Sequence, residues 1–141
     1  RKYGLEDMVR FTGRLTTEEL VRQYSAAEVA ITPSLYEGFG LPAVEAMACE
    51  VAIVGSNSGA IPDVIGDAGL LFNEGDAAGL RAVLDRLFSA SSFRLDLIAR
   101  GRRRAEKDFS WSTIASQIRA VWYEALNRPP LEIRRRTRHS F

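Results

Sequence analysis

Residues 33–48 read PSLYEGFGLPAVEAMA, and this stretch decides the fold. The residues before it, Ala27–Thr32, are mostly apolar and predict a buried strand. Pro42 predicts the first position of a helix, because a proline there loses no hydrogen bond. Gly38 and Gly40 predict a sharp turn between the strand and the helix. A strand, a short turn and a helix make up the repeating half-unit of a parallel α/β sheet.

Two carboxylates frame this turn, Glu37 just before it and Glu45 in the first turns of the helix. The N-terminus of a helix carries a partial positive charge and free amide groups, so it attracts phosphate. Carboxylates beside such a site would repel phosphate and are better suited to hydroxyl groups. A phosphate site flanked by carboxylates that accept hydrogen bonds from hydroxyl groups predicts a sugar nucleotide as the ligand.

The rest of the chain alternates between strand and helix patterns. We expect strands at Val9–Gly13, Glu28–Thr32, Val51–Gly55 and Leu70–Phe72, and helices after Thr16, over Asp76–Phe88, over Phe93–Phe109 and from a Ser112 cap to Leu126. The predicted inward positions are Leu80, Val83, Leu84 and Leu87 in the helix over 76–88, and Leu95, Ile98 and Ala99 in the helix over 93–109. Residues 56–69 are rich in turn formers, Tyr24 reads as a core residue, and residues 102–104 read as a solvated arginine face. The predicted fold is α/β, a Rossmann-like parallel sheet flanked by helices, with ligands at the carboxyl edge of its strands.

The wording around Glu37 and Glu45 closely resembles the Glu-x7-Glu signature of the glycosyltransferase group 1 family (family four), retaining enzymes of the GT-B fold. The resemblance runs from about Leu5 to Tyr123 and includes the loop at residues 58–69 and the segment at residues 109–111. We expect the segment at 109–111 to have a packing role. It implies part of the C-terminal, donor-binding domain of a GT-B glycosyltransferase over residues 1–126, followed by a basic tail at 127–141. The opening residues 1–5 lack a methionine and read as the end of a helix, so we expect a fragment.

The resemblance also implies roles for individual residues. Glu37 matches the catalytic glutamate that lies against the transferred sugar, and Glu45 matches the one that binds the ribose hydroxyls of the donor. The remaining substrate-binding residues that it implies are the loop at Gly38, Phe39, Gly40 and Leu41, whose amides face the diphosphate and sugar, and Arg14 and Leu15 near the base. The family needs no metal and no cofactor, and a nucleotide-diphosphate sugar is its donor substrate.

The chain departs from the family pattern at Glu50 and Ala52, where glycine and proline are usual, and at Asp63, where glutamate is usual. A glutamate at position 50 would make a left-handed helix end costlier. The basic residues that clamp the diphosphate and the acceptor-binding N-terminal domain would lie upstream of Arg1. An isolated copy would expose sheet edges, so we expect self-association or a partner that supplies the missing strands.

The amino-acid composition limits the classes of function that the chain can have. The chain of 141 residues is 46% hydrophobic and 26% charged with a net charge of +1, which gives no general attraction to nucleic acid. The lone Cys49 reads as a packing residue, and it predicts a reducing, cytoplasmic compartment, with no spanning segment in the sequence. The tail carries five arginines against Glu132, and reads either as a solvated segment or as a peripheral contact for anionic lipids at the inner face of the membrane.

Two other functions remain open at this point. The chain could be a non-catalytic Rossmann-like module used for assembly, or a GT-B enzyme with another chemistry, such as a sugar-nucleotide epimerase. Nucleotide binding separates the first of these from a transferase. The sequence alone leaves the base, the sugar and the acceptor undecided.

Overall fold

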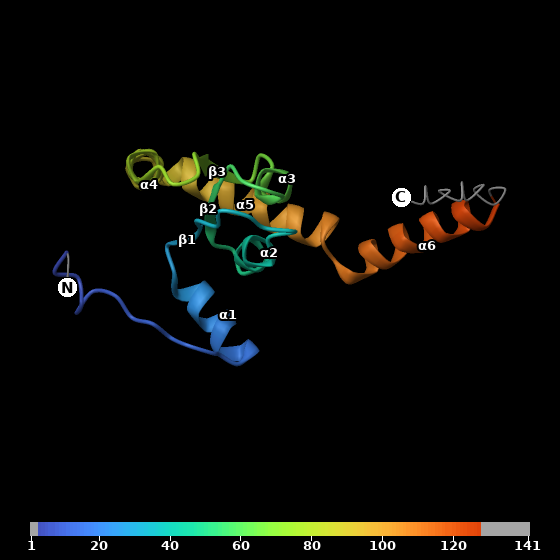
Figure 1. Ribbon diagram of the computed structural model, residues 1–141, viewed down its shortest axis with the longest axis horizontal. Helices are drawn as coiled ribbons and strands as arrows, with labels where there is room; N and C mark the ends of the chain where they lie inside the picture. Colours follow the sequence, from blue (N-terminus) through green and yellow to red (C-terminus); the bar gives the residue numbers. More distant parts are fainter. Residues whose placement is uncertain (1–2, 128–141) are drawn as a thin grey trace, which may run out of the picture. The chain divides into compact units, whose positions relative to one another are not determined.

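The computed structural model describes residues 3–127, and the chain forms two compact units, Arg1–Phe109 and Ser110–Phe141 (Figure 1). The first unit contains α1 (Thr17–Ala26), β1 (Val29–Thr32), α2 (Leu41–Ala48), β2 (Ala52–Ser56), α3 (Ile61–Ile65), β3 (Gly69–Phe72), α4 (Ala77–Ser89) and α5 (Ser91–Asp108). The described part of the second unit holds α6 (Trp111–Asn127). The boundary expected between residues 126 and 127 stays a prediction, since the basic tail from residue 128 onward lies outside the described residues.

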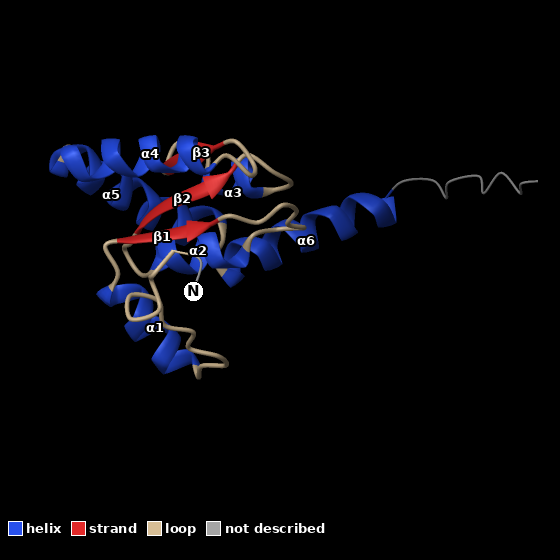
Figure 2. Cartoon of the chain, turned by 60° about the vertical axis from the view of Figure 1, so that its left-hand side comes forward, coloured by secondary structure: helices blue, strands red, loops and turns tan. Residues whose placement is uncertain are grey.

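The three strands form one parallel sheet in the order β1-β2-β3, and Figure 2 shows the arrows of β1 and β2 side by side and pointing the same way. Val29 lies opposite Ala52 in the first pair, and Ile53 lies opposite Gly69 in the second. Every residue of β2 is buried, as the continuous apolar run predicted. The expected fold class, a parallel α/β sheet flanked by helices, is confirmed.

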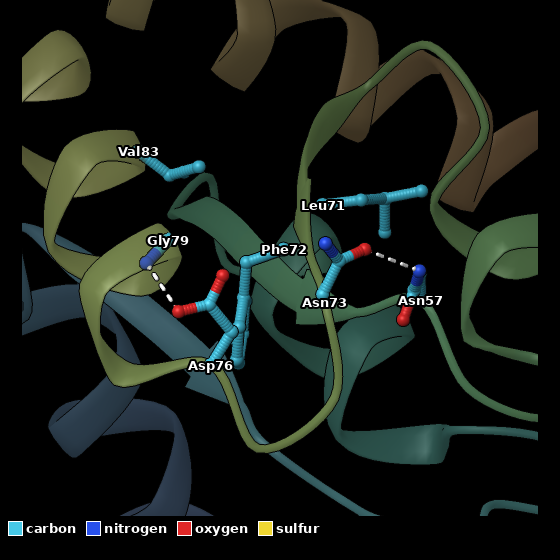
Figure 3. A pocket seen from close by; sticks show the side chains of 7 residues that line it. All are labelled: Asn57, Leu71, Phe72, Asn73, Asp76, Gly79 and Val83. Atoms are coloured by element: carbon cyan, nitrogen blue, oxygen red, sulfur yellow. Dashed lines mark hydrogen bonds between the residues drawn. The ribbon is translucent and has the colours of Figure 1, made fainter.

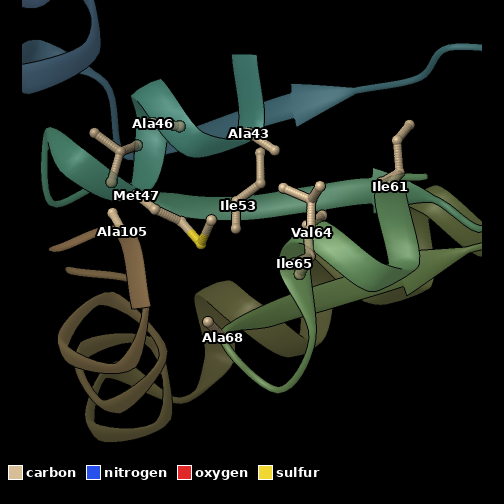
Figure 4. Close-up of a cluster of buried hydrophobic side chains, with 10 residues drawn as sticks. Ala43, Ala46, Met47, Ile53, Ile61, Val64, Ile65, Ala68 and Ala105 are labelled. Atoms are coloured by element: carbon tan, nitrogen blue, oxygen red, sulfur yellow. The ribbon is translucent and has the colours of Figure 1, made fainter. Parts of the chain in front are cut away.

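Alternate residues of β2 belong to two separate hydrophobic clusters. Ile53 packs with Met47 of α2 and with Ile61 and Ile65 of α3 in the larger cluster (Figure 4). Ala52 and Val54 belong to the other cluster, which contains Phe72, Leu87 and Leu97. Because side chains alternate across a strand, this division shows that helices cover both faces of the central strand.

The first helix begins as the sequence predicts. Thr16 caps it through a capping box, in which the Thr16 hydroxyl accepts from the Glu19 amide and the Glu19 carboxylate accepts from the Thr16 amide at 2.8 Å. No residue of α1 is fully buried, and Tyr24 is among the partly buried residues packed on the larger cluster. Local capping therefore supports a helix that has only a modest packed face.

The end of α2 requires a left-handed residue, and that residue is Glu50, with a φ of 59°. The Glu50 amide donates to Met47 O at 3.2 Å, and the Val51 amide donates to Ala46 O at 3.0 Å. These two bonds form a Schellman motif, in which glycine is the usual residue. The sequence expectation that Glu50 sits at a costly left-handed terminus is confirmed.

The strand expected at Val9–Gly13 is wrong. Residues 9–13 contain no strand, and their side chains are exposed, with Phe11 at 94%. A strand is stable only when a neighbour accepts and donates its ladder hydrogen bonds, and no strand of the described residues lies beside this segment. The alternating pattern is present, but the pairing partner is not.

Other helix predictions need smaller corrections. The turn-rich region contains the short helix α3, which the sequence pattern does not predict because Pro62 lies within it and Gly59 and Gly66 flank it. Leu95 and Ala99 of α5 are exposed, and Leu97, Gly101 and Ala105 point inward instead. Ser110 rather than Ser112 caps α6, because its hydroxyl accepts from the Thr113 amide at 3.2 Å while Ser112 already lies in the helix. Residues 3–8 form bends and turns, not the end of a helix.

The arginine run of α5 is not a solvated face. Arg102 donates to Ala48 O at 2.5 Å, at the end of α2. Arg104 donates to Val64 O at 2.8 Å and to Asp63 O at 2.7 Å, at the end of α3, while Arg103 is exposed. Two cations therefore satisfy the last carbonyls of two helices, where the helix dipole also favours positive charge.

Candidate functional site

The site begins at the carboxyl end of β1, where residues 33–40 form a loop that leads into α2. Gly40 is the N-cap of α2, with a φ of 91° and a ψ of 46°, a conformation that favours glycine. Gly38 has no positive φ, so only the second of the two predicted turn glycines is required by the backbone. The helix starts at Leu41, which places Pro42 at its second position rather than its first.

Glu37 lies in this loop and accepts a hydrogen bond from Ser34. The Ser34 hydroxyl donates to Glu37 Oε1 at 2.9 Å, so one carboxylate oxygen is held by the loop itself. Glu37 is half-buried, while its neighbours Tyr36 and Gly38 are exposed. The hydrogen bond from Ser34 therefore orients the Glu37 carboxylate at the carboxyl edge of the sheet.

A second loop, residues 57–60 after β2, holds the first one in place together with Ser56 at the end of that strand, and we call it the bracing loop. The buried Ser56 hydroxyl donates to Ser34 O at 2.6 Å, the Ser58 hydroxyl donates to Leu35 O, and the Ala60 amide donates to Glu37 O at 3.1 Å. Parallel strands bring their carboxyl ends to one edge, which explains why these two loops meet. The sequence analysis does not predict this contact, although the serines at positions 56 and 58, where a predicted strand ends, are a signal for it.

Gly59 of the second loop lies against the backbone of Glu37. A Cβ built on Gly59 would come within 2.5 Å of Glu37 O and 2.9 Å of Glu37 N, and its φ is 56°. Two reasons thus require glycine here, a left-handed backbone and a close approach. The sequence feature is the Ser58-Gly59 pair that resembles the family loop.

Glu45 lies on α2 and accepts a hydrogen bond from α1. The Tyr24 hydroxyl donates to Glu45 Oε2 and to Pro42 O, both at 3.3 Å. Burial raises the pKa of Tyr24 to about 12, and the negative charge of Glu45 acts in the same direction. The phenol is therefore protonated, and a hydrogen-bond donor, throughout the neutral pH range.

The sequence reading of Tyr24 as a core residue covers only half of its role. The ring packs on the larger cluster, and the hydroxyl contacts Glu45. Cys49 also packs on this cluster, and burial raises the pKa of its thiol, in agreement with the predicted packing role.

Phe39 and Leu41 belong to the same loop, and each is partly open to solvent. The Phe39 ring packs edge-on against Phe109, with 5.7 Å between ring centroids. The packing role expected for the segment at residues 109–111 is confirmed for Phe109 by this contact and by its place on the larger cluster, but it is wrong for Trp111, which is 85% exposed. Leu41 is 60% exposed at the first position of α2, which leaves it accessible to a ligand.

Arg14 and Leu15 are not brought to the glutamates by any hydrogen bond or ion pair within residues 3–127. Arg14 is exposed, and Leu15 is half-buried just before the Thr16 cap of α1. The segment that was expected to carry them, the strand at Val9–Gly13, does not form. Their proximity to a nucleotide base stays a prediction.

Asp63 and Asp67 do not form a metal site. Asp67 pairs with Arg100 at 3.5 Å, and the Asp63 backbone carbonyl is bound by Arg104. Within residues 3–127, no three acidic, histidine or cysteine side chains gather closely enough to hold an ion. The expectation that no metal is needed stays a prediction.

A small cavity of about 250 Å³ lies at the carboxyl end of β3 (Figure 3). Its polar side chains bond to near neighbours: Asn57 Nδ2 donates to Asn73 Oδ1 at 2.9 Å, Asn57 Oδ1 accepts from the Glu74 amide at 3.0 Å, and Asp76 caps α4 through the Gly79 amide at 2.9 Å. These bonds brace the turn between β3 and α4. We therefore assign the cavity a structural role.

Comparison with known proteins places this arrangement in a family. A model of the family described as "Glycosyl transferases group 1" matches residues 1–104. The chain belongs to this family. The matched range contains both glutamates, the glycine loop and the bracing loop.

Two curated relatives are mannosyltransferases. The MMP alpha-(1->4)-mannosyltransferase of Mycolicibacterium hassiacum is 45% identical over 128 residues, which cover 89% of this chain and 31% of the relative. The O-antigen chain mannosyltransferase B of Escherichia coli is 40% identical over 112 residues, which cover 79% of this chain and 29% of the relative. The chain thus spans about a third of the length of these relatives.

Among solved structures, sucrose-phosphate synthase from Thermosynechococcus elongatus has the same fold. It superposes with a TM-score of 0.81 at 35% identity, over 89% of this chain and 32% of that chain. The expected fold, part of a GT-B glycosyltransferase, is confirmed by this match. In residues 3–127 the structure contains no helix that combines the length and apolar character needed to cross a bilayer.

Proposed function

We propose that this chain is the donor-binding half of a retaining glycosyltransferase. A nucleotide-diphosphate sugar binds at the loop from Glu37 to Glu45, and its glycosyl group passes to an acceptor held elsewhere in the protein. The observation that carries the proposal is the start of α2. Its N-cap is Gly40, which has no side chain to bind the amides of the helix start, and the half-buried carboxylates of Glu37 and Glu45 lie before and after it in the chain.

The diphosphate would bind at the amides of residues 38–41. The first hydrogen bond of the helix start is donated by the Ala43 amide to Gly40 O at 3.0 Å. The amides of residues 38–41 precede it, so they have no acceptor within the helix. Together with the positive end of the helix dipole they favour an anion. Neutralisation by helix amides is the reason why the proposal includes no metal ion.

The two carboxylates would divide the recognition of the sugar nucleotide. Glu45 accepts hydrogen bonds from the ribose hydroxyls. Glu37 lies against the transferred sugar and stabilises the positive charge that develops at the anomeric carbon, an effect realised mainly in the transition state. The bond between the anomeric carbon and the diphosphate breaks, and the nucleoside diphosphate leaves with the bonding electrons. The acceptor hydroxyl oxygen bonds to the anomeric carbon with retention of configuration, and its proton passes to the departing diphosphate.

Mannose is the first donor sugar to test. The two relatives at 45% and 40% identity are both called mannosyltransferases. Their names support a mannosyl donor without identifying the base or the acceptor.

Titration of the chain with guanosine and uridine diphosphates tests the binding half of the proposal. We expect saturable binding of one of them, with a dissociation constant as weak as the millimolar range. Glu45→Gln should weaken it about tenfold or more, because a charged acceptor is replaced by a neutral amide.

A structural Glu45 would behave in the opposite way. Glu45→Gln would then lower the melting temperature and leave nucleotide affinity unchanged. Equal, non-saturating signals from both nucleotides would overturn the proposal and favour an assembly module.

A further inference from the structure

Tyr24 joins α1 to the functional end of α2. Its hydroxyl bonds to two oxygens of that helix, Pro42 O in the first turn and Glu45 Oε2 one turn further, both at 3.3 Å. The phenol has one hydrogen and two acceptors at the same distance, so it can donate to either of them. A single phenol thus fixes the position of the Glu45 side chain relative to the backbone of its own helix.

The surroundings of Tyr24 hold the phenol in place. The groove beside β1, about 230 Å³, is lined by Tyr24 together with Leu20, Ala27 and Pro42, among others. The ring packs on the larger hydrophobic cluster, so the hydroxyl is delivered by a packed side chain and not by a loose one. Burial and the charge of Glu45 raise the pKa of Tyr24 to about 12, so its hydroxyl is a donor throughout the neutral pH range.

We propose that Tyr24 is a positioning residue for the donor site: it holds one oxygen of Glu45 so that the other is presented to the nucleotide. This inference rests on the proposed role of Glu45 in nucleotide binding. A glutamate has several rotamers, and a side chain that is ordered before binding does not lose that freedom when the ligand arrives. Tyr24 thereby increases nucleotide affinity without touching the nucleotide.

A purely structural role for Tyr24 predicts something different. α1 has no fully buried residue, so the Tyr24 ring serves to anchor this helix, and phenylalanine would serve as well. Tyr24→Phe keeps the ring and removes only the hydroxyl. It therefore separates anchoring from positioning.

The experiment is a double-mutant cycle on the full chain, with affinity for guanosine and uridine diphosphates measured by calorimetry. We expect Tyr24→Phe to weaken binding about fivefold, the scale of losing one hydrogen bond to a charged group through a long contact. In a Glu45→Ala background the same substitution should change affinity less than twofold, because no carboxylate remains to be held.

Thr16→Ala is the matched control. It removes the capping box at the other end of α1 and leaves the contact between Tyr24 and Glu45 in place. It should lower the melting temperature and leave affinity unchanged. If Thr16→Ala weakens binding as much as Tyr24→Phe does, affinity follows the stability of α1 and the positioning role is overturned.

The remaining outcomes separate this inference from the proposed function. If Glu45→Ala weakens binding while Tyr24→Phe does not, or if the two effects add, Tyr24 does not act through Glu45 and the inference fails alone. If Glu45→Ala leaves affinity unchanged, or if neither nucleotide binds, the role of Glu45 fails and the inference fails with it. A fivefold loss that disappears in the Glu45→Ala background supports both.

Discussion

At the scale of single residues, Glu37 is the side chain whose charge matters most to the proposed chemistry. Glu37→Gln keeps an oxygen that can accept from Ser34, whose hydroxyl lies 2.9 Å from Glu37 Oε1, so the loop should keep its shape. In the complete glycosyltransferase we expect turnover to fall about 10²-fold or more, the scale of losing one electrostatic stabiliser. The Michaelis constant for the donor should change much less, because the lost interaction belongs to the transition state.

Steady-state kinetics with a varied donor concentration measure this split. Glu18→Gln, an exposed glutamate in the first turn of α1, is the control and should leave both constants unchanged. Normal turnover with weakened donor affinity in Glu37→Gln would show that Glu37 only binds, as Glu45 is proposed to do. The two carboxylates would then share one task.

Gly59 sets the distance between the bracing loop and Glu37. Gly59→Ala adds a methyl group that would lie 2.5 Å from Glu37 O, in a backbone at a φ of 56°. We expect a loss of about 2–4 kcal/mol of stability, from the left-handed strain and the forced displacement together, and weaker nucleotide binding. Chemical denaturation and nucleotide titration measure the two effects.

Gly75→Ala isolates the strain. Gly75 has a φ of 73°, and a Cβ there would have nothing within 4 Å. This control should lose about 1–2 kcal/mol, the strain alone, and keep its nucleotide affinity. Equal losses in the two variants would mean that the contact with Glu37 adds nothing.

At the scale of secondary-structure elements, the end of α2 keeps a residue that is poorly suited to it. Glu50 has a φ of 59° in a Schellman motif, and its ion pair with Arg102 is long, at 3.9 Å, and exposed. Glu50→Gly should therefore raise the free energy of unfolding by about 0.5–1 kcal/mol. The relief of backbone strain exceeds the two opposing contributions, which are the loss of the weak surface ion pair and the greater conformational entropy of glycine in the unfolded chain. The melting temperature should rise by a few degrees.

Glu50→Ala tests this account of the strain. It removes the carboxylate but keeps Cβ, so it should give no increase in melting temperature. A gain in Glu50→Ala equal to that in Glu50→Gly would assign the effect to the charge instead of the backbone.

Most elements could be predicted because their signals are local. The capping box at Thr16, the continuous apolar run of β2 and the glycine turn before α2 each depend on neighbouring residues only. The misses arise where a partner decides. The segment at 9–13 has a strand pattern but no strand beside it, and the two arginines of α5 that bind helix ends are distant in sequence from Ala48 and Val64.

The candidate site shows the same limit. Glu37, Gly40 and Glu45 could be found from a contiguous motif. The hydroxyls of Tyr24, Ser56 and Ser58 come from other elements, and only the fold brings them to that motif. Their residue types gave no signal that would separate them from packing or turn residues.

At the scale of the whole molecule, the three-stranded sheet of the described residues has two edge strands, β1 and β3. β1 pairs with β2 on one side, and no strand within residues 3–127 pairs with its other side. The groove between α1 and this edge is lined mainly by apolar residues, among them Leu20, Val29 and Ile31. Free backbone groups beside an apolar groove favour the addition of another strand.

We therefore expect the chain to self-associate, or to bind a partner that supplies a strand, through the edge of β1. Light scattering at high micromolar concentration should show a mass above that of the monomer, and this mass should fall on dilution. Ile31→Lys should shift the equilibrium toward the monomer, because Ile31 is 39% exposed on this strand and a lysine there opposes edge pairing. Leu71→Lys, at 37% exposure on β3, makes the same change at the other edge strand and should leave the mass unchanged. A wild-type chain that stays monomeric at high micromolar concentration would contradict the prediction, and an effect of Leu71→Lys alone would move the interface to β3.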